Sequence, residues 1–470
     1  MNELGHGNVG KREQHFNALL PLRKHSYAPR LLAELADKMK SEPESVEDGP
    51  DPEENLLVPA GYTYLGQFVD HDLTFDSTSS LDPANSARPT NLRTPRFDLD
   101  CLYGDGPAAQ PFMYDGDKLL YKNEPATTDP NAPAGEDLLR NPLGRAIIGD
   151  KRNDENSIVS QIQLAFVKYH NAVVDTLNNK DPACWNTPHQ LFESARNEVR
   201  WAYQKILVDD FLPRIVAAEA LVGLQDKTPN EREDQYFLYS KKLRNRLPRE
   251  FVAAAYRFGH SMVRTGYRLN AVPENSFNIF PLSTDNTAMA GTVSLLGFDP
   301  VPNNQVIDSW GRFFPETLPG VLPSEARKTW QDQPEGRERL QFAYKIDTSL
   351  VDPLSVLPRK EVAGEDTTQQ AIKLVGPLPD TIGTPSRPSL ALLNLLRGNS
   401  YQIQNGQVFA EFLKASGYQF TPIGKQHLVT REAFDKDGNA FFKYEPIPEA
   451  LQEDTPLWFY GRWCINHQIV

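Results

Sequence analysis

Three polar side chains lie close together in an otherwise apolar segment, where they could act on one ligand. In GQFVDHDLTF, residues 66–75, Gln67 is followed by Asp70 and His71 at spacings of three and four. If the segment is helical, the three side chains share one face. Histidine exchanges protons near neutral pH, which suits general acid–base chemistry. A lone buried histidine is more often a core residue, but burying three polar groups without a ligand is costly, so the pattern predicts a site.

The elements that must hold such a site are predicted to be helices. In several segments apolar residues recur at spacings of three and four, as on one helix face. The predicted helices cover residues 154–178, 190–212, 249–265, 387–398 and 407–416. Asn153 or Asp154 is the expected N-cap of the first helix, and Pro213 is expected to end the second.

Composition predicts a large, ordered and mainly α protein. The chain has 470 residues, 39% of them hydrophobic, and its 38 prolines require many loops because helix interiors exclude proline. Alternation typical of strands is rare. We expect an extended or weakly helical N-terminal arm over residues 1–55, followed by one domain over 56–470 with long irregular loops and little β structure. Residues 76–145 are expected to be mainly loop.

Charge and cysteine content exclude several classes of protein. The net charge of −13 disfavours binding to nucleic acid, which needs clustered lysine and arginine. The three cysteines, at positions 101, 184 and 464, form no disulfide framework or zinc motif and are expected to be free thiols. No apolar run is long enough for a transmembrane segment, and the first 25 residues lack the apolar core of a signal peptide. Cytoplasmic location and release without a signal peptide both stay open, as does the oligomeric state.

The segment GQFVDHDLTF resembles the distal helix of the animal haem peroxidases, and further motifs of that family follow in order over roughly residues 60–400. The resemblance implies haem b as cofactor and hydrogen peroxide as oxidant. It also implies a ferryl intermediate that oxidises small donors, either aromatic molecules or anions. By this resemblance His71 transfers the peroxide proton, Gln67 binds water and anions in the pocket, and Asp70 forms an ester with a haem methyl group.

The segment GDKRNDEN, residues 149–156, resembles the family's second distal motif. Arg152 matches the arginine that stabilises charge as the peroxide bond breaks, and Glu155 matches a second ester-forming carboxylate. Without the first motif, these residues would be interpreted as ordinary capping before a helix. Asn156 stands where myeloperoxidase has a methionine bonded to haem. At most two ester bonds are therefore implied, together with a preference for iodide, bromide or thiocyanate over chloride.

The segment AYRFGHSMV resembles the family's proximal motif, in which His260 matches the haem iron ligand. Arg257 matches an arginine that pairs with a haem propionate. The superfamily's fatty-acid oxygenases carry a radical-forming tyrosine at that place, so Arg257 favours a peroxidase. In LALLNLLRGNSY, Asn394 matches the residue that accepts a hydrogen bond from the ligand histidine, and Arg397 follows it.

The segment TPRFDLDCLYG resembles the family's calcium loop. Thr94, Asp98 and Asp100 match ligand positions there, and Arg96 would contribute its backbone carbonyl. Asp72, next to the distal histidine, completes the set. Oxygen ligands at alternate positions suit Ca²⁺, and three carboxylates would repel one another without a cation. Asp100 replaces a more usual serine and makes the site more anionic. A solvated acidic loop is the alternative.

Two other functions stay open at this stage. One is a fatty-acid oxygenase of the same superfamily, and the other is a non-catalytic binding module that keeps the fold. The short chain and few cysteines indicate a bacterial member of the family. The physiological donor and the extent of ester linkage cannot be predicted from the chain.

Overall fold

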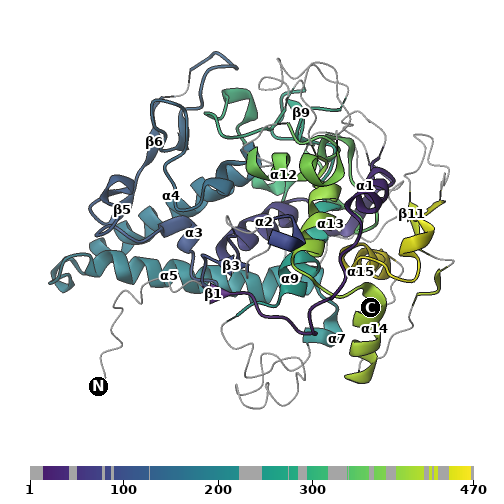
Figure 1. The fold of residues 1–470 in the computed structure, drawn as a ribbon. Coiled ribbons are helices and arrows are strands. Elements are labelled where there is room, and N and C mark those ends of the chain that lie inside the picture. The colour runs from purple at the N-terminus through teal and green to yellow at the C-terminus, as the bar shows by residue number, and fades with distance from the viewer. Residues whose placement is uncertain are drawn as a thin grey trace, which may run out of the picture.

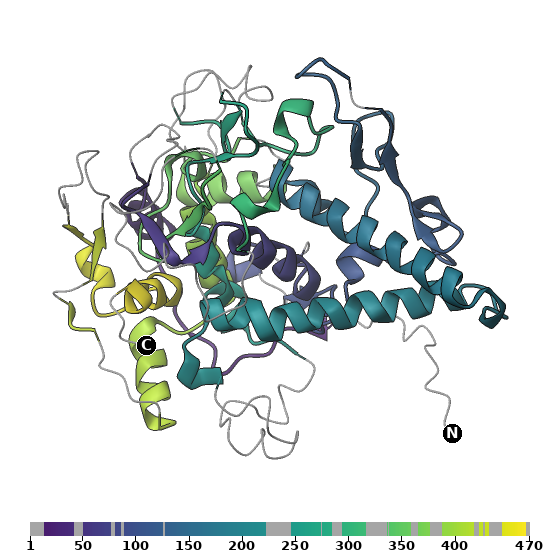
Figure 2. The same cartoon turned by 180° about the vertical axis from the view of Figure 1, so that it is seen from behind.

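The structure is a computed structural model, and helices are its main regular secondary structure (Figure 1). It describes residues 14–41, 50–76, 80–85, 89–125, 127–221, 246–273, 275–283, 294–315, 336, 338–358, 365–376, 388–417, 423–425, 428–431 and 444–466. Helix α2 lies near the centre, with α4 and α5 on one side and α13 and α15 on the other (Figure 1). Seen from behind, α4 and α5 extend together away from the rest of the molecule (Figure 2). Among the described helices, none is both long and apolar enough to cross a membrane.

The α-helices differ widely in length, from four to 24 residues. They are α1 (Pro29–Asp37), α2 (Gly61–Leu73), α3 (Asp100–Tyr103), α4 (Ser157–Lys180), α5 (Gln190–Ile206), α6 (Leu212–Ile215), α7 (Ala218–Leu221), α9 (Arg249–Ala253), α12 (Glu365–Val375), α13 (Leu390–Ser400), α14 (Gly406–Ala415) and α15 (Leu457–Asn466). Two 3₁₀ helices carry predicted site residues, namely η3 (Lys151–Asp154) and η6 (Ala255–His260).

The strands are short and form separate antiparallel pairs. The pairs are β1 (Gln14–His15) with β3 (Thr90–Asn91), β2 (Glu54–Pro59) with β10 (Phe342–Tyr344), β4 (Tyr114–Asp115) with β5 (Lys118–Leu119), β6 (Tyr121–Asn123) with β7 (Glu136–Leu138), β8 (Gly266–Arg268) with β9 (Ser276–Asn278), and β11 (Val429–Arg431) with β12 (Tyr444–Pro446). The prediction of a mainly α fold with little β structure is confirmed.

Two large hydrophobic clusters hold these helices together. One joins α2, α4 and α5 through buried residues such as Phe68, Ile158 and Tyr203. The other joins α1, α13 and α15 and includes Leu32 and Leu396. Helix α2 packs against α4 and also touches η3 and η6. The central helix is therefore fixed from several sides, which gives its polar residues a defined orientation.

Several predicted helix boundaries were wrong. Helix α4 begins at Ser157 and is capped by Asn156, because Asn153 and Asp154 already belong to η3. Pro213 does not end the helical path. After α5 a π-helical turn, Leu207–Phe211, leads into α6, where Pro213 occupies the first turn. A proline is tolerated there because the first N–H groups of a helix need no intrahelical acceptor.

The helix predicted over 249–265 was also wrong. The chain forms the short helix α9, leaves helical geometry at Ala254 (φ −135°, ψ −68°) and continues as η6. On one side of the break the Arg249 guanidinium donates to the carbonyl of Tyr401, and on the other the Tyr256 hydroxyl donates to that of Gly66. Tertiary contacts of this kind override local helix propensity.

The described part of the N-terminal segment packs against the rest of the molecule at several residues, although others are exposed. In α1, Leu32 and Leu35 are fully buried against the α13 side of the molecule. Glu54, the next-to-last residue of the acidic stretch 41–55, is buried and forms ion pairs with Arg264 and Arg339. Most of that stretch, residues 42–49, lies outside the described residues. The division into an arm and a domain near residue 55 stays a prediction.

Candidate active site

The distal histidine is buried on α2 with one ring nitrogen already engaged. Nδ1 of His71 lies 2.7 Å from Oδ1 of Asn153. Because an amide oxygen only accepts, Nδ1 carries the proton and Nε2 keeps its lone pair. Nε2 makes no hydrogen bond to a described residue. Burial, followed by the nearby Arg152 charge, lowers the pKa of His71 to about 4, so the ring is neutral near pH 7.

A second amide orients Asn153. Its Nδ2 donates to Oε1 of Gln163 over 2.9 Å, and both side chains are almost fully buried. The sequence predicts Asn153 only as a helix cap and does not predict a role for Gln163. It offers weak signals for both, because Asn153 directly follows Arg152 and Gln163 is a polar residue on the buried face of α4.

Gln67 is fixed at both ends of its amide. Its Nε2 donates to Oε2 of Glu155 at 3.0 Å, and its Oε1 accepts from Nδ2 of Asn156 at 3.1 Å. Asn156 also caps α4, since its Oδ1 accepts from the backbone N–H groups of Ile158 and Val159. Burial raises the pKa of Glu155 to about 7. In the sequence, Asn156 indicates only that a methionine is absent. In the structure its side chain binds Gln67 and caps α4.

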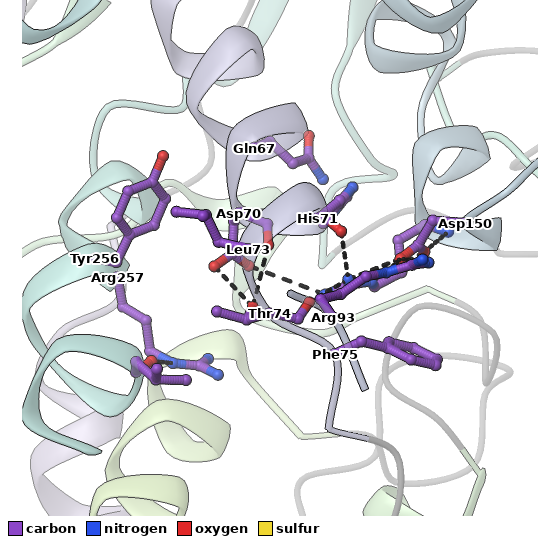
Figure 3. A network of polar contacts seen from close by, with 12 residues as sticks. Gln67, Asp70, His71, Leu73, Thr74, Phe75, Arg93, Asp150, Tyr256 and Arg257 are labelled. Atoms are coloured by element: carbon purple, nitrogen blue, oxygen red, sulfur yellow. Dashed lines mark hydrogen bonds and ion pairs between the residues drawn. The ribbon is translucent and has the colours of Figure 1, made fainter. Parts of the chain in front are cut away.

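The guanidinium of Arg152 is held on one side and open on the other. Its Nε and Nη2 donate to Asp150 at 3.1 and 2.8 Å, and Nη2 also reaches the carbonyls of His71 and Thr74. Nη1 makes no hydrogen bond to a described residue and lies 4.0 Å from Oδ2 of Asp70. Figure 3 shows Asp70, His71, Thr74 and Asp150 around this network.

The structure therefore brings Gln67, Asp70 and His71 together with Arg152 and Glu155, as the sequence predicts. Asp70 keeps part of its carboxylate exposed, and its Oδ1 accepts from the Thr74 hydroxyl at 3.0 Å. The chemical roles assigned to these residues remain predictions.

On the proximal side, His260 also faces an asparagine. Nδ1 of His260 lies 2.8 Å from Nδ2 of Asn394, while Oδ1 of Asn394 accepts from Nη1 of Arg257 at 2.6 Å. A guanidinium only donates, so the Asn394 oxygen faces Arg257 and its NH₂ group faces His260. The structure thus differs from the prediction on one point, because here Asn394 donates to His260 instead of accepting from it.

Neighbouring contacts tie the proximal segment to the distal helix. The Tyr256 hydroxyl donates to the Gly66 carbonyl on α2 at 3.1 Å, and Tyr256 and Arg257 lie on the segment beside Asp70 (Figure 3). Nε of Arg257 donates to the Val252 carbonyl at 2.9 Å. In this structure Arg257 is engaged by protein groups. Arg397, on α13, has its guanidinium 5.7 Å from the ring centre of Tyr401.

Three carboxylates converge beside the distal helix. Oxygens of Asp72, Asp98 and Asp100 lie within 4.8 Å of one another. Neither oxygen of the fully buried Asp72 has a donor in hydrogen-bonding geometry among the described residues, and burial together with the two other carboxylates raises its pKa to about 8. Leu99 has a left-handed backbone (φ 59°), a strained state that a non-glycine residue seldom adopts. This arrangement fits a bound divalent cation.

Thr94 lies at the edge of the carboxylate cluster, where its hydroxyl donates to Oδ2 of Asp98 at 2.6 Å. The side chain of Arg96 is exposed, and the use of its carbonyl as a ligand stays a prediction.

The residues at the centre also fit a haem group. Nε2 of His260, like that of His71, makes no hydrogen bond to a described residue. A side-chain carbon built on Gly259 would meet no atom within 4 Å, so there is open space beside His260. Only the orientation of the Asn394 amide differs from that expected for a metal-bound histidine.

The chain is similar to known proteins in part of its sequence and in its fold. Residues 82–301 match the family model for animal haem peroxidase. A stretch of 116 residues, 25% of the chain, is 34% identical to a peroxidase-like protein of Margaritifera margaritifera, and it spans only 14% of that relative. The fold superposes on peroxidase A of Dictyostelium discoideum with a TM-score of 0.52 and 13% identity, covering 97% of this chain and 87% of that one. A rice fatty acid alpha-dioxygenase superposes with a TM-score of 0.47 and 16% identity, covering 92% and 68% of the two chains.

The family match does not include α2, whose residues Gln67, Asp70 and His71 precede it, but the structure joins that helix to the matched segment through Asn153, Glu155 and Arg152. A bacterial source stays a prediction. Residues 82–301 therefore resemble the animal haem peroxidase family in sequence, and the chain shares its fold with a peroxidase of Dictyostelium discoideum.

Proposed function

We propose that this protein is a haem-dependent peroxidase that uses hydrogen peroxide to oxidise small donors. The match of residues 82–301 to the family model for animal haem peroxidase supports a peroxidase-type oxidoreductase. One observation about this chain's own residues supports the proposal most directly. His71 has its proton on Nδ1, held by Asn153, so that the lone pair of Nε2 is available to a substrate.

In this proposal His71 transfers the peroxide proton, and Arg152 stabilises the charge that develops on peroxide. Nε2 of His71 accepts the proton of the attacking oxygen and returns it to the departing oxygen. Nη1 of Arg152, which no described acceptor occupies, stabilises the negative charge on that departing oxygen. Gln67, fixed by Glu155 and Asn156, orients water or an anion. The haem, when bound, supplies the redox chemistry.

His260 is the proposed iron ligand. A histidine that binds a metal through Nε2 keeps its proton on Nδ1 and needs an acceptor there. Asn394 meets this need once its amide is turned, which requires Arg257 to leave its oxygen. A haem propionate is a suitable new partner for Arg257, and Arg397 is a second candidate for such a carboxylate.

The remaining site residues are assigned by the same proposal. Asp70 and Glu155 would form ester bonds to the haem. Asp72, Thr94, Arg96, Asp98 and Asp100 would bind Ca²⁺ and so fix the distal helix. The expected donors are aromatic molecules or easily oxidised anions such as iodide, bromide and thiocyanate.

No observation favours a fatty-acid oxygenase over a peroxidase. Arg257 stands at the place of the radical-forming tyrosine of such enzymes, and the hydroxyl of the adjacent Tyr256 is bound to the Gly66 carbonyl. Oxygen uptake that depends on a fatty acid would reverse this ranking. A non-catalytic module would be indicated if the purified protein failed to retain haem.

The first experiment is an absorption spectrum of the purified protein before and after one equivalent of hydrogen peroxide, followed by extraction with acidified acetone. We expect a Soret band that shifts with peroxide and haem that resists extraction. Extractable haem would remove the ester assignment but keep the enzyme. Absence of a Soret band after haem supplementation would contradict the proposed function.

A further inference from the structure

A buried arginine outside the proposed site joins the carboxylate cluster to the catalytic segment. Nη1 of Arg93 lies 3.3 Å from Oδ1 of Asp100, one of the cluster's three carboxylates. Nη2 and Nε of the same side chain donate to Oδ2 of Asp150 at 2.6 and 3.2 Å. Arg93 is only 6% exposed, so water screens these contacts poorly.

Asp150 accepts hydrogen bonds from Arg152 as well as from Arg93. Its Oδ1 accepts from the backbone N–H and Nε of Arg152 at 2.9 and 3.1 Å, while its Oδ2 is shared between Arg93 and Nη2 of Arg152. Both guanidinium groups thus compete for one carboxylate oxygen. Figure 3 shows Arg93 and Asp150 in contact beside His71.

The backbone reinforces this connection. A side-chain carbon built on Gly149 would lie 2.5 Å from the Cys101 carbonyl oxygen and 2.8 Å from that of Asp100, so only glycine permits this approach. Nη2 of Arg93 also donates to the Gly149 carbonyl at 3.1 Å. The cluster and the start of η3 therefore pack directly against each other.

We propose that Arg93 and Asp150 are positioning residues that couple cation binding at Asp72, Asp98 and Asp100 to the placement of Arg152. A bound cation competes with Arg93 for Asp100. Arg93 then turns more fully to Asp150 and releases Nη2 of Arg152, which leaves more positive charge for an anion in the pocket. The coupling is reciprocal by thermodynamic necessity. This inference rests on the proposed cation site and on the proposed role of Arg152.

A double-mutant cycle on Ca²⁺ affinity tests the coupling without measuring turnover. The full chain, as purified, is stripped with a chelator and titrated with Ca²⁺ by calorimetry, as wild type, Arg93→Gln, Arg152→Gln and the double variant. Arg93→Gln removes the competing charge and should tighten Ca²⁺ binding roughly tenfold. Arg152→Gln should tighten it roughly threefold, because Arg93 then moves to Asp150, and the double variant should bind no more tightly than Arg93→Gln.

Additive effects of the two substitutions would overturn the proposal, as would a wild-type protein that binds no Ca²⁺. Lys168→Gln is the charge-matched control, since Lys168 forms an exposed ion pair with Glu136 and should leave Ca²⁺ affinity unchanged. If Arg93→Gln does not fold, Asp150→Asn weakens the carboxylate that joins Arg93 to Arg152 without removing a cation ligand, and the effect of Arg152→Gln should disappear in that background.

The cycle and the proposed function can fail separately. Arg93, Asp150 and Arg152 contact one another through protein atoms alone. A protein without peroxide reactivity would therefore contradict the proposed function while the non-additive Ca²⁺ affinities still supported the coupling. An active peroxidase with additive affinities would contradict the coupling only.

Discussion

The two central histidines use the same kind of neighbour to opposite effect. His71 faces the oxygen of an asparagine amide at 2.7 Å, whereas His260 faces the nitrogen of another at 2.8 Å. His71 is therefore protonated on Nδ1, and a neutral His260 carries its proton on Nε2. The difference comes from a third residue, because Gln163 accepts from Asn153 while Arg257 donates to Asn394.

This contrast teaches that the pairing of histidine with asparagine does not by itself assign a role. The distal pair is already arranged for a base that uses Nε2. On the proximal side, the Asn394 amide must turn its oxygen toward Nδ1 of His260 before Nε2 of His260 can bind a metal. Arg257 opposes this turn as long as it donates to the Asn394 oxygen.

Removing each histidine should separate the two roles most clearly. His260→Ala should retain almost no haem after reconstitution, because the proposed iron ligand is absent. His71→Ala should keep haem but react with peroxide about 10²–10⁴-fold more slowly, the usual contribution of a general acid–base residue. Bound haem is measured from the Soret band and reaction rates by stopped-flow mixing. Wild-type peroxide reactivity in His71→Ala would refute its role.

Changing the distal asparagine should have the next largest effect. Asn153→Leu leaves Nδ1 of His71 without an acceptor, and we expect the peroxide reaction to slow about 10–100-fold, as for other residues that orient a functional histidine. Asn153→Asp keeps an acceptor and is the matched control, with a smaller loss expected. Equal rates for Asn153→Leu and the wild type would show that Asn153 does not orient the base.

The proximal asparagine should affect haem retention more than peroxide chemistry. Asn394→Ala removes the proposed acceptor for His260, so haem affinity should fall about 10–100-fold. The peroxide reaction of the haem that remains bound should change less. Transfer of haem to an excess of an acceptor protein measures the first quantity, and stopped-flow mixing measures the second. The reverse pattern would contradict the assignment of Asn394 to the iron ligand.

The smallest expected effect concerns pH and ester formation. Burial raises the pKa of Glu155 from 4.5 to about 7, so its carboxyl is protonated in the folded protein over most of that interval. Ester formation needs the carboxylate, and the share of linked haem after peroxide treatment should rise with pH through about 7. Peroxide treatment at about pH 6 and about pH 8, followed in each case by extraction with acidified acetone, measures this share. In Glu155→Gln, which keeps only Asp70, the rise should disappear.

The sequence predicted the residues that meet at the centre but not the contacts that orient them. Periodicity located α4, α5, α13 and α14 because each buries one continuous face. It failed at α9 and η6, where side-chain contacts to Gly66 and Tyr401 decide the backbone path. No local pattern marks such contacts.

The same limit applies to the site. Motif order predicted His71, Arg152 and His260 as site residues, and the structure shows which neighbours contact each of them. The links from Asn153 to Gln163 and from Arg93 to Asp150 span ten and 57 residues, and nothing in the sequence pairs them. The orientation of an amide depends on its whole surroundings and has no signature in the sequence.

Asn156 gives this site an unexpected constraint on its evolution. It caps α4 and also binds the side chain of Gln67. By the sequence resemblance, its position corresponds to that of the haem-bonded methionine of myeloperoxidase. Replacing it by methionine would remove the cap, at about 1 kcal/mol, and would release the amide of Gln67. A lineage that gained the third haem bond would first need another way to begin this helix. If haem binds through the two proposed ester bonds, the present asparagine thus makes a third bond hard to gain by a single mutation.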